Sequence, residues 1–414
     1  MQVAVVGGGV NGVCTAYFLA EAGHEVVVLE RYGNVAQETS FGNAGMVAPA
    51  HAAPWAAPGM PGKILSYLWK SEAPVLIKAK FDPALWRWMR RWLDECKLDR
   101  FLVNRARMQR LASYSQQMLR LLREHHSLDY ERTSGVLQLF RGEPDLRMAQ
   151  PALEWLQRCG MEHRLLDADA ARALEPALSG ETPLAAALHL PRDESGNCPQ
   201  FTRQLKKIAQ DMGVGFHFNT QVEAISPRNG RIDLTLGGQA FSADAVVLAA
   251  GSESQRLLRG SGISLPFYPV KGYCGTAVIK DFDAAPLAAL ADETYKVAIT
   301  RMGSRIRIAG AAELGSRSSD LHAAALRTLI KVGEDWFPRA TNFHSATFWC
   351  GARPMLPDGV PLLGATPVRN LYINIGDGAS GWAMAAGAGK VLADLISGRS
   401  TDIDLDGLTM ARYG

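Results

Sequence analysis

Residues 2–30, QVAVVGGGVNGVCTAYFLAEAGHEVVVLE, decide the fold. Residues 2–6 are mostly apolar and predict a short buried strand. A helix is predicted from the glycines that follow as far as Ala22, with Gly23 as its C-cap, and a second strand covers residues 25–29. A strand, a glycine-rich turn, a helix and a further strand in this order indicate a nucleotide-binding βαβ unit.

The turn has the spacing Gly7-x-Gly9-x-x-Gly12, and Glu30 follows 18 residues later. The first glycine permits a tight turn, the second lets a pyrophosphate approach the backbone, and the third lets the helix lie close to the sheet. Glu30 can accept hydrogen bonds from both ribose hydroxyls and would repel a 2′-phosphate, which disfavours NADP. A plain turn is the alternative, but the flanking strand and helix favour a dinucleotide site.

NAD and FAD proteins share this motif, so the rest of the chain must distinguish them. The regular βαβ repeats of a simple NAD enzyme do not follow. Residues 39–49, TSFGNAGMVAP, are instead small, with hydroxyl and amide groups. Such a stretch lets the backbone approach a flat ring system closely, which favours FAD. A plain surface loop is the alternative, and the low charge of the stretch argues against it.

Composition narrows the class of protein. The chain has 414 residues, which favours two domains, and 47% are apolar and 21% charged. A net charge of +3 is too small to indicate a nucleic-acid surface, and no apolar run is long enough to predict a membrane-spanning helix. The N-terminus lacks the basic residues of a signal peptide. Six cysteines without a C-x-x-C pair and nine histidines without metal-ligand spacing predict reduced thiols, no metal and a cytoplasmic location.

The pattern further along the chain suggests how the nucleotide unit is completed. Apolar strands at 243–251 (ADAVVLAAG) and 371–375 (LYINI) resemble central strands, and an apolar helix ends near Ile396. Between residues 266 and 349 the apolar residues alternate, which predicts an antiparallel sheet. Helices are predicted over 101–124, 143–160, 167–174 and 201–212, and a strand over 135–140.

We therefore expect an α/β (α+β) fold in which both ends of the chain build one Rossmann-type FAD-binding domain. A substrate-binding domain with a mixed or antiparallel sheet is inserted into it. The expected FAD-binding domain comprises residues 1–65, 186–265 and 345–414. The expected substrate-binding domain comprises residues 66–185 and 266–344.

Residues 55–93 combine aromatic and basic side chains. They contain Trp55, Trp69, Trp86, Trp88 and Trp92, interleaved with Lys63, Lys70, Lys78, Lys80, Arg87, Arg90 and Arg91. This combination suits a membrane surface, and a packed helical region with solvated lysines explains it equally well. A peripheral position at the inner face of the cell membrane is therefore an open hypothesis.

Residues 349–364, WCGARPMLPDGVPLLG, hold one arginine between Gly351 and Pro354. Arg353 needs an anion in this otherwise nearly uncharged run. An internal salt bridge to Asp358 or another acid would supply one. A bound ligand with a carboxylate would be the other source, because a guanidinium offers two parallel N–H donors to a carboxylate.

Several motifs carry a family resemblance that runs nearly end to end. They are VVGGGVNG at 5–12, ETSFGNAG at 38–45, AAPWAAPG at 52–59, LQLF at 137–140, YPVKGY at 268–273, DETYKVAITR at 292–301, ATFWCGARPMLPDGVPLLG at 346–364 and GWAMAAGAG at 381–389. On these the chain resembles the small-subunit-type, FAD-dependent D-amino acid dehydrogenases of the D-amino acid oxidase/glycine oxidase superfamily. The resemblance implies a glycine oxidase-like fold with the active site between two domains.

The resemblance also implies a reaction. Arg353 is expected to bind the substrate carboxylate, so that the Cα–H leaves as hydride to flavin N5 without a dedicated base. Tyr273 and Tyr295 match family positions near the substrate, and packing within the sheet is the alternative for both. His51 is expected to line or gate the pocket. Electrons would pass to a quinone or another carrier rather than to oxygen.

Non-covalent FAD is the implied cofactor, although Cys350 lies near the position where some amine oxidases attach flavin covalently. The residues expected to bind FAD come from every part of the proposed nucleotide domain. They are Gly7, Gly9, Val10, Asn11, Gly12, Glu30, Arg31, Thr39, Ser40, Asn43, Ala44, Gly45, Met46, Val222, Ala250, Gly251, Gly351, Gly376, Asp377, Gly378, Ser380, Gly381 and Trp382.

The chain departs from the family pattern at two places near the expected pocket. A common G-H-G is Gly376-Asp377-Gly378 here, and the loop reads PAH at 49–51. An aspartate at the flavin edge would disfavour an anionic reduced flavin. The substrate is therefore expected to be a D-amino acid or a D-imino acid, with D-proline and cis-4-hydroxy-D-proline as candidates beside D-alanine.

Two other hypotheses remain open. The chain could be a flavin-bearing subunit of a larger dehydrogenase complex, with little activity without its partner subunits. It could also be a membrane-associated nucleotide-binding module without chemistry. Arg353 together with Tyr273 argues against the second, because such a module has no use for a carboxylate clamp.

Overall fold

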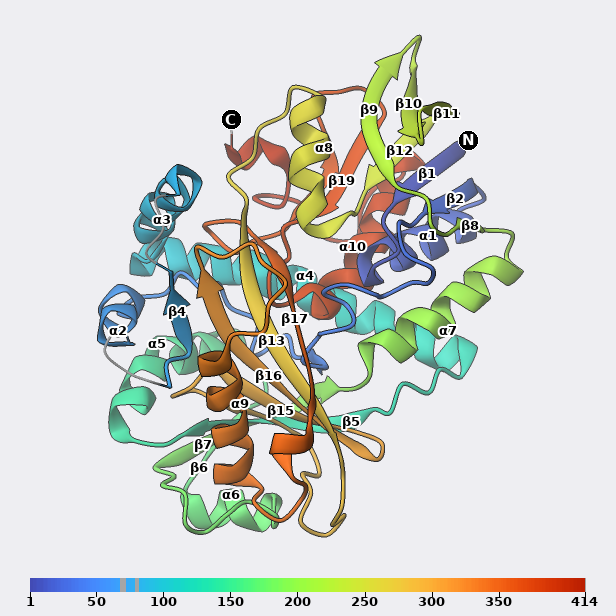
Figure 1. Ribbon diagram of the computed structural model, residues 1–414. Helices are drawn as coiled ribbons and strands as arrows, with labels where there is room; N and C mark the ends of the chain where they lie inside the picture. The colour runs from blue at the N-terminus through green and yellow to red at the C-terminus, as the bar shows by residue number, and fades with distance from the viewer. Residues whose placement is uncertain (68–71, 79–81, 414) are drawn as a thin grey trace.

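The computed structural model describes residues 1–67, 72–78 and 82–413, which form two large β-sheets and a small three-stranded sheet, with helices around them (Figure 1). Three side chains of the predicted aromatic and basic segment, Trp69, Lys70 and Lys80, lie outside the described residues. The sheet that carries the N-terminus lies in the upper part of Figure 1, and the larger sheet lies below it.

The smaller sheet has six strands. In spatial order they are β18 (Leu362–Ala365), β19 (Leu371–Ile375), β12 (Ala245–Leu248), β1 (Gln2–Val6), β2 (Glu25–Leu29) and β8 (Gly215–His217). All neighbours run parallel except β18 and β19. Strands from both ends and from the middle of the chain therefore meet in one sheet, as the sequence predicted.

Alternate residues of β1 are buried on opposite faces of this sheet. Val3 and Val5 pack against a helical layer, and Ala4 and Val6 pack on the other side. The helical layer contains α1 (Val10–Glu21), α7 (Cys198–Asp211), α10 (Gly381–Ile396) and part of α4 (Leu98–His126). The opposite layer contains α8 (Ser254–Gly260) and a three-stranded sheet of β9 (Val222–Arg228), β10 (Arg231–Leu236) and β11 (Gln239–Ala243). Burial on both faces explains the continuous apolar runs of these parallel strands.

The larger sheet has ten strands and is largely antiparallel. Its main path is β17 (Thr347–Met355), β13 (Tyr268–Val278), β16 (Arg305–Leu314), β15 (Val297–Met302), β14 (Ala289–Asp292), β5 (Thr133–Phe140), β7 (Ala186–Ser195) and β3 (Met46–Val47), and β4 (Val75–Ile77) and β6 (Arg164–Leu166) pair beside it. Helix α9 (Ala323–Trp336) covers one face, and α5 (Glu143–Arg158) packs on the other. The antiparallel sheet that was predicted from the alternating apolar residues between 266 and 349 is thus confirmed.

Some strands pair in a different sheet from the one that the predicted domain limits imply. Strands β3, β7 and β17 pair in the larger sheet, although their residues fall within the ranges proposed for the FAD-binding domain. The reason is that these strands connect the two sheets, and spacing along the sequence does not show in which sheet a connecting strand pairs. The helices predicted over 101–124, 143–160, 167–174 and 201–212 are confirmed as α4, α5, α6 (Ala168–Leu174) and α7.

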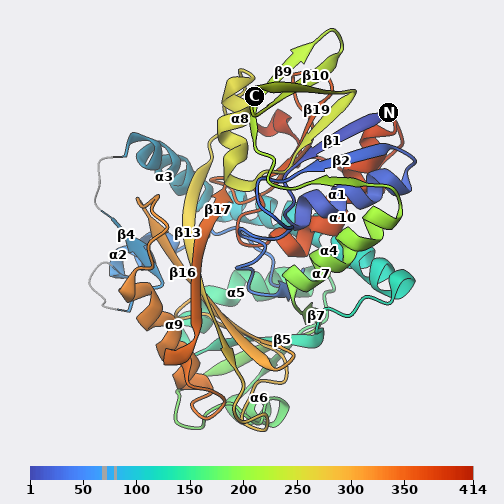
Figure 2. The same cartoon turned by 45° about the vertical axis from the view of Figure 1, so that its right-hand side comes forward.

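The aromatic segment forms α2 (Met60–Tyr67) and α3 (Pro83–Glu95), at the edge of the molecule away from the N-terminus (Figure 2). Trp88 and Trp92 are buried against Trp55, whereas Trp86 is 57% exposed. Most of the described tryptophans here are therefore core residues. Short 3₁₀ helices complete the secondary structure: η1 (Gly251–Glu253), η2 (Phe343–Ser345) and η3 (Met410–Tyr413).

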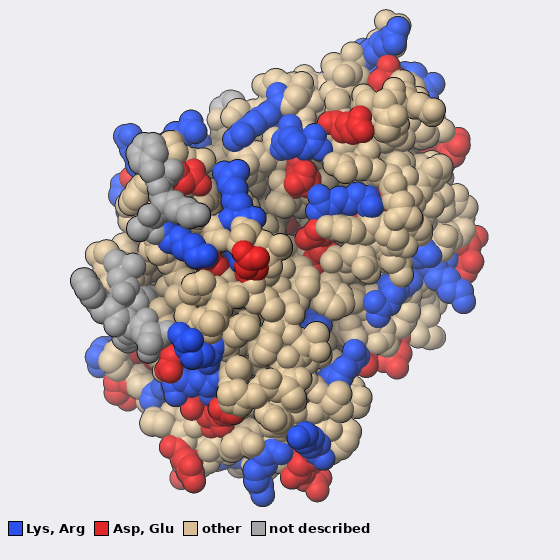
Figure 3. Space-filling model, in the orientation of Figure 1, with Lys and Arg blue, Asp and Glu red and all other residues tan. Residues whose placement is uncertain are grey.

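The face shown in Figure 3 mixes positive and negative side chains, and uncharged surface covers much of its lower half. Among the described residues, no helix combines the length and apolar character that crossing a bilayer requires. The fold is thus the expected mixed α/β architecture with a nucleotide-type sheet beside a larger, mainly antiparallel one.

Candidate active site

A cleft lies at the carboxyl ends of β1, β2 and β12, where ligands bind in doubly wound sheets. Many of the residues predicted to bind the cofactor line it. These are Gly7, Gly9, Val10, Asn11, Glu30, Arg31, Thr39, Ser40, Val222, Ala250, Gly251 and Asp377. The cleft therefore collects residues from both ends and from the middle of the chain.

The glycine-rich turn is shaped by close contacts that admit no side chain. Gly7 has φ +110°, and a Cβ there would lie 2.5 Å from the Ala249 carbonyl oxygen. A Cβ on Gly12 would lie 1.9 Å from the Gly7 carbonyl oxygen. Helix α1 then begins at Val10, with Gly9 as an N-cap that has no side chain and with no acidic residue in its first turn. Its N–H groups and positive dipole end are suited to the pyrophosphate of a dinucleotide.

Glu30 lies at the end of β2 with little exposed surface. Its carboxylate accepts hydrogen bonds from the backbone N–H groups of Gly8, at 2.6 Å, and Tyr32, at 2.9 Å. These two contacts fix the carboxylate at the cleft, and its remaining lone pairs can accept from ribose hydroxyls. The buried Oδ1 of Asn11 also lines the cleft without a hydrogen-bond partner among the described residues. The polar groups present therefore fit an FAD-type nucleotide.

The larger sheet holds the loop at 39–46 in place. The Thr300 hydroxyl donates to the Ala44 carbonyl at 2.7 Å. The buried Arg307 donates to the carbonyls of Phe41, at 2.5 Å, and Asn43, at 3.0 Å. Sequence reasoning missed both anchors, although an arginine inside the apolar strand pattern of SRIRIAG was a signal that its charge must be satisfied internally.

A second cavity adjoins the cleft, and Thr39 lines both. It is lined by the predicted residues Asn43, Ala44, Met46, Gly351, Gly378 and Ser380, and by Arg353, Tyr273 and His51. Five predicted cofactor residues line neither space: Gly12, Gly45, Gly376, Gly381 and Trp382. Trp382 differs most from the prediction, because its ring is buried among Tyr130 and Phe201 in the helical core.

Arg353 faces this second cavity from β17. Among the described residues, its guanidinium donates a single hydrogen bond, to the carbonyl of Ala311 at 3.4 Å. Ala311 has φ +46° and lies in a β-bulge, where the pairing register of β13 and β16 shifts. Among the described residues Arg353 forms no ion pair, because the carboxylate of Asp358 is bound 2.7 Å from Arg412 Nε. The alternative of a salt bridge to Asp358 is therefore wrong.

Gly272 on β13 makes room for this arginine. A Cβ at residue 272 would lie 2.3 Å from the Arg353 Cζ, so the guanidinium lies directly over the neighbouring backbone. Burial lowers the pKa of Arg353, and no carboxylate among the described residues lies close enough to pair with it. An unpaired guanidinium at a cavity wall can bind a carboxylate through two parallel N–H groups.

The hydroxyl of Tyr273 is already engaged. It donates to the carboxylate of Glu313, which is fully buried and also lies 3.0 Å from Lys78 Nζ and 3.6 Å from Lys271 Nζ. Burial and this carboxylate raise the pKa of Tyr273, so the phenol stays protonated. Tyr273 lines the cavity, but its proton is directed at Glu313.

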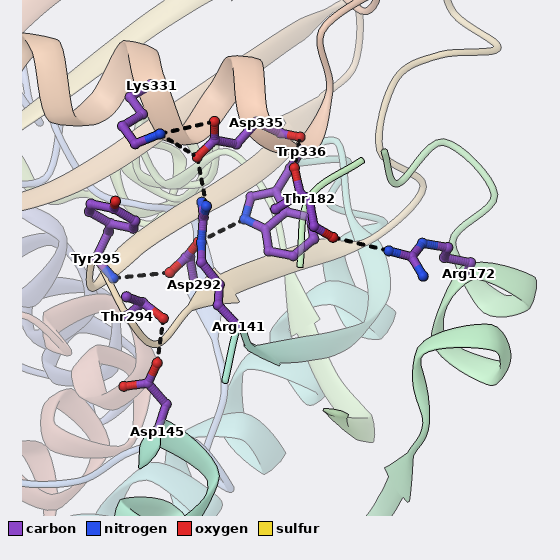
Figure 4. Close-up of polar contacts among 10 residues, drawn as sticks. All are labelled: Arg141, Asp145, Arg172, Thr182, Asp292, Thr294, Tyr295, Lys331, Asp335 and Trp336. Carbon is purple, nitrogen blue, oxygen red and sulfur yellow. Dashed lines mark hydrogen bonds and ion pairs between the residues drawn. The ribbon is translucent and has the colours of Figure 1, made fainter. Parts of the chain in front are cut away.

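Tyr295 does not line the cavity. Its ring lies under the guanidinium of Arg141, with 4.7 Å from Cζ to the ring centroid. Its backbone N–H donates to Asp292 Oδ1 at 3.0 Å. Asp292 also accepts from Arg141, at 2.6 Å, and from Trp336, at 2.7 Å (Figure 4). The predicted contact of Tyr295 with a substrate is therefore not supported; the packing alternative describes its position.

His51 lines the cavity in a polar cluster. Its Nδ1 is hydrogen-bonded to the amide of Gln138, which also donates to Glu293 at 3.3 Å. Lys296 pairs with Glu293. Burial lowers the pKa of His51, which favours the neutral imidazole at neutral pH. Gln138, Glu293 and Lys296 belong to the family motifs but were not identified as site residues from the sequence.

Asp377 lies at the edge of the nucleotide cleft and accepts a hydrogen bond from Asn11 Nδ2 at 2.9 Å. Burial raises its pKa from 3.8 to about 6, and the Asn11 contact opposes this shift. Because the folded state holds the proton more tightly than the unfolded chain, this carboxyl favours folding at low pH. That contribution is lost as the pH rises from about 4 to about 6.

Replacing Asp377 by asparagine should therefore stabilise the FAD-bound protein more at about pH 7.5 than at about pH 4.5. Thermal unfolding with excess FAD at both pH values measures this difference. Asp211→Asn, at an exposed position at the end of α7, is the control. An Asp377→Asn effect of equal size at both pH values would contradict the assigned burial of this carboxyl.

The chain matches the family model described as "DAO: FAD dependent oxidoreductase" over residues 2–395. A D-amino acid dehydrogenase 1 of Mesorhizobium japonicum is 45% identical over 416 aligned residues, with 100% of both chains covered. A D-amino acid dehydrogenase of Bradyrhizobium diazoefficiens is also 45% identical, covering 100% of this chain and 99% of its own.

Solved structures show the same fold at lower identity. Glycine oxidase from Geobacillus kaustophilus superposes with a TM-score of 0.78 at 22% identity, covering 99% of each chain. L-proline dehydrogenase from P. horikoshii gives a TM-score of 0.74 at 17% identity, covering 100% of this chain and 97% of its own. With the family model spanning nearly all residues and full-length relatives at 45% identity, the chain belongs to the DAO family of FAD-dependent oxidoreductases.

Proposed function

We propose that the protein is an FAD-dependent dehydrogenase of D-amino acids in which Arg353 binds the substrate α-carboxylate. The observation that carries this proposal is a guanidinium at the wall of the second cavity with no carboxylate partner among the described residues. Relatives that match the whole chain at 45% identity are named D-amino acid dehydrogenases, which supports the same substrate class.

The protein's own part in the reaction is mainly orientation. Arg353 would hold the carboxylate, and the residues at 42–44, 46 and 351 that line the same cavity would limit where Cα can lie. FAD, when bound, supplies the oxidant that takes a hydride from Cα and stores its two electrons. We assign non-covalent binding of FAD to the cleft and to this cavity wall.

Deprotonation of the substrate needs no base among these side chains. The amine must be neutral so that its lone pair can assist loss of the hydride. The product is an iminium ion, which becomes the imine when it releases a proton to water. The Tyr273 proton is held toward Glu313, so this phenol is not arranged as a general base. The imine of a primary amino acid then hydrolyses to a 2-oxo acid and ammonia, whereas an imino acid gives a cyclic product.

The finer identity of the substrate and the acceptor is part of the proposal. D-proline and cis-4-hydroxy-D-proline are candidates beside D-alanine, because the sequence departs from the family pattern at Asp377 and at residues 49–51. Electrons would leave to a quinone or another carrier. The alternative function is a flavin-bearing subunit of a larger complex, which would show little activity without its partner subunits.

A position at the surface of an anionic membrane is a further part of the proposal. Helix α3 and its surroundings expose Trp86 and Leu93, at 57% and 49%, next to exposed Arg87, Arg90 and Arg91. Apolar side chains flanked by cations suit an anionic lipid surface. We place the protein in the cytoplasm, at the inner face of the cell membrane.

Vesicles that contain anionic lipid should therefore cosediment with the protein, and vesicles of zwitterionic lipid should not. Changing Arg87, Arg90 and Arg91 together to glutamine should abolish binding, because each surface cation contributes about 1 kcal/mol. Arg120→Gln, on the exposed side of α4, is the matched control. Equal cosedimentation with both kinds of vesicle would disprove this electrostatic attachment.

The proposed reaction predicts stereospecific reduction of the flavin. D-proline, cis-4-hydroxy-D-proline and D-alanine, added anaerobically in turn, should include at least one that bleaches the flavin absorbance, and their L-forms should not. The amino acid that bleaches the flavin fastest identifies the preferred substrate among these candidates. If no amino acid bleaches the purified protein but activity appears with partner subunits, the alternative function replaces this one.

Arg353→Met should lower kcat/KM for a D-amino acid by roughly 30-fold or more, because the substrate carboxylate loses a buried charged partner. Arg353→Lys should recover part of this loss, since it restores the charge without the two parallel donors. Steady-state kinetics with an artificial electron acceptor measure both variants. A KM that stays unchanged in Arg353→Met would show that the carboxylate binds elsewhere.

A further inference from the structure

The cavity that contains Arg353 is also lined by a second arginine, Arg105 of α4. Only 3% of Arg105 is exposed. Its position follows Phe101 by four residues and precedes Met108 by three, so it lies on the buried face of the helix, where the period requires an apolar residue. Sequence reasoning did not single it out, although a charge on this face was a readable signal.

The contacts of Arg105 leave its guanidinium incompletely satisfied. One Nη donates to the Ala50 carbonyl at 3.2 Å, and its Cζ lies 5.9 Å from the Phe101 ring centroid. Its Nε is buried without an acceptor among the described residues. Burial lowers the pKa of Arg105 to about 10, so it stays charged at neutral pH. A buried cation without a counter-ion is destabilising unless a ligand supplies the anion.

The other charged side chains that line the cavity already have partners. Lys63 lies 2.8 Å from Asp145, and Lys296 pairs with Glu293. Asp292 is held by Arg141, which comes from outside the lining. Among the described residues, Arg105 and Arg353 are thus the two cations of this cavity without a carboxylate partner. One projects from a strand of the larger sheet and the other from a helix.

We propose that Arg105 binds an anionic group on the substrate side chain, so that the preferred substrates are D-amino acids with a second carboxylate. This inference rests on the proposed function, in which Arg353 takes the α-carboxylate. Two separate guanidinium groups that line one cavity supply one cation for each of the two carboxylates of D-aspartate or D-glutamate. The amide of D-glutamine has the same shape as the D-glutamate side chain but lacks its charge, which makes this pair the decisive comparison.

A purely structural role for Arg105 is the competing explanation. Its hydrogen bond to Ala50 supports the loop that carries His51, and losing that support would affect every substrate alike. If Arg105 binds the substrate side chain instead, its loss changes the ratio of kcat/KM between charged and neutral substrates. The test therefore measures selectivity rather than activity alone.

The first measurement is kcat/KM of the wild-type holoenzyme for D-glutamate, D-aspartate, D-glutamine and D-alanine. We expect kcat/KM for D-glutamate to exceed kcat/KM for D-glutamine by at least about tenfold in the wild-type enzyme. In Arg105→Met the ratio of these two values should fall toward one. Arg110→Met, on the same helix but paired with Asp404 outside the cavity, should keep the wild-type ratio. A wild-type enzyme that does not prefer D-glutamate to D-glutamine overturns the proposal, whatever the variants do.

Ligand binding gives a test that does not depend on turnover. Glutarate, with two carboxylates, should perturb the flavin absorbance of the holoenzyme at lower concentration than butyrate, and Arg105→Met should remove that difference. Sodium chloride at equal ionic strength should not displace glutarate if both arginines bind it together. If no D-amino acid reduces the flavin, the proposed function fails, and equal binding of glutarate and butyrate would separately refute the role of Arg105.

Discussion

The candidate site depends on an uncompensated charge that the fold holds in place. Arg353 lies over the backbone of Gly272, where no side chain fits, and beside a bulge that directs the carbonyl of Ala311 toward it. The nearest acid along the chain, Asp358, is bound by Arg412 from the C-terminal 3₁₀ helix. The surrounding protein thus prevents Arg353 from finding an internal anion. This leaves the guanidinium available to a ligand in the cavity, where partial burial makes such an interaction stronger than it would be in bulk water.

The two sheets act together because several connections join them at the cofactor residues. The loop at 39–46 follows the nucleotide-binding unit in sequence, yet Thr300 and Arg307 of the larger sheet hold its carbonyls. Strand β17 pairs in the larger sheet and carries Arg353, and an isolated bridge joins its end at Met355 to Asp377 of the cleft. Residues proposed to hold FAD and the residue proposed to hold the substrate therefore share one scaffold. A shared scaffold fixes the distance between the proposed cofactor site and the proposed substrate site. A mechanism that depends on orientation requires such a fixed distance.

The parts of the fold set by local pattern were predictable. The βαβ unit at the N-terminus, the period-two strands and the long helix α4 all agree with the structure. The candidate site was less predictable from the sequence, because it depends on which side chains from distant parts of the chain pair with one another. Asp358 was a reasonable partner for Arg353 until the structure showed Arg412 in that role. Trp382 follows a glycine-rich turn, but its side chain points into the helical core. Tyr295 belongs to a conspicuous motif, yet its contacts with Asp292 and Arg141 hold it outside the lining of the cavity. Arg105 was hidden within an amphipathic helix.

The most direct test of this account is a crystal structure of the oxidised, FAD-bound protein with a non-oxidisable carboxylate such as glutarate. We predict that one carboxylate accepts two hydrogen bonds from the Arg353 guanidinium, each about 2.7 to 2.9 Å long. A carboxylate bound elsewhere in the cavity, with Arg353 paired to a protein acid instead, would contradict the central claim.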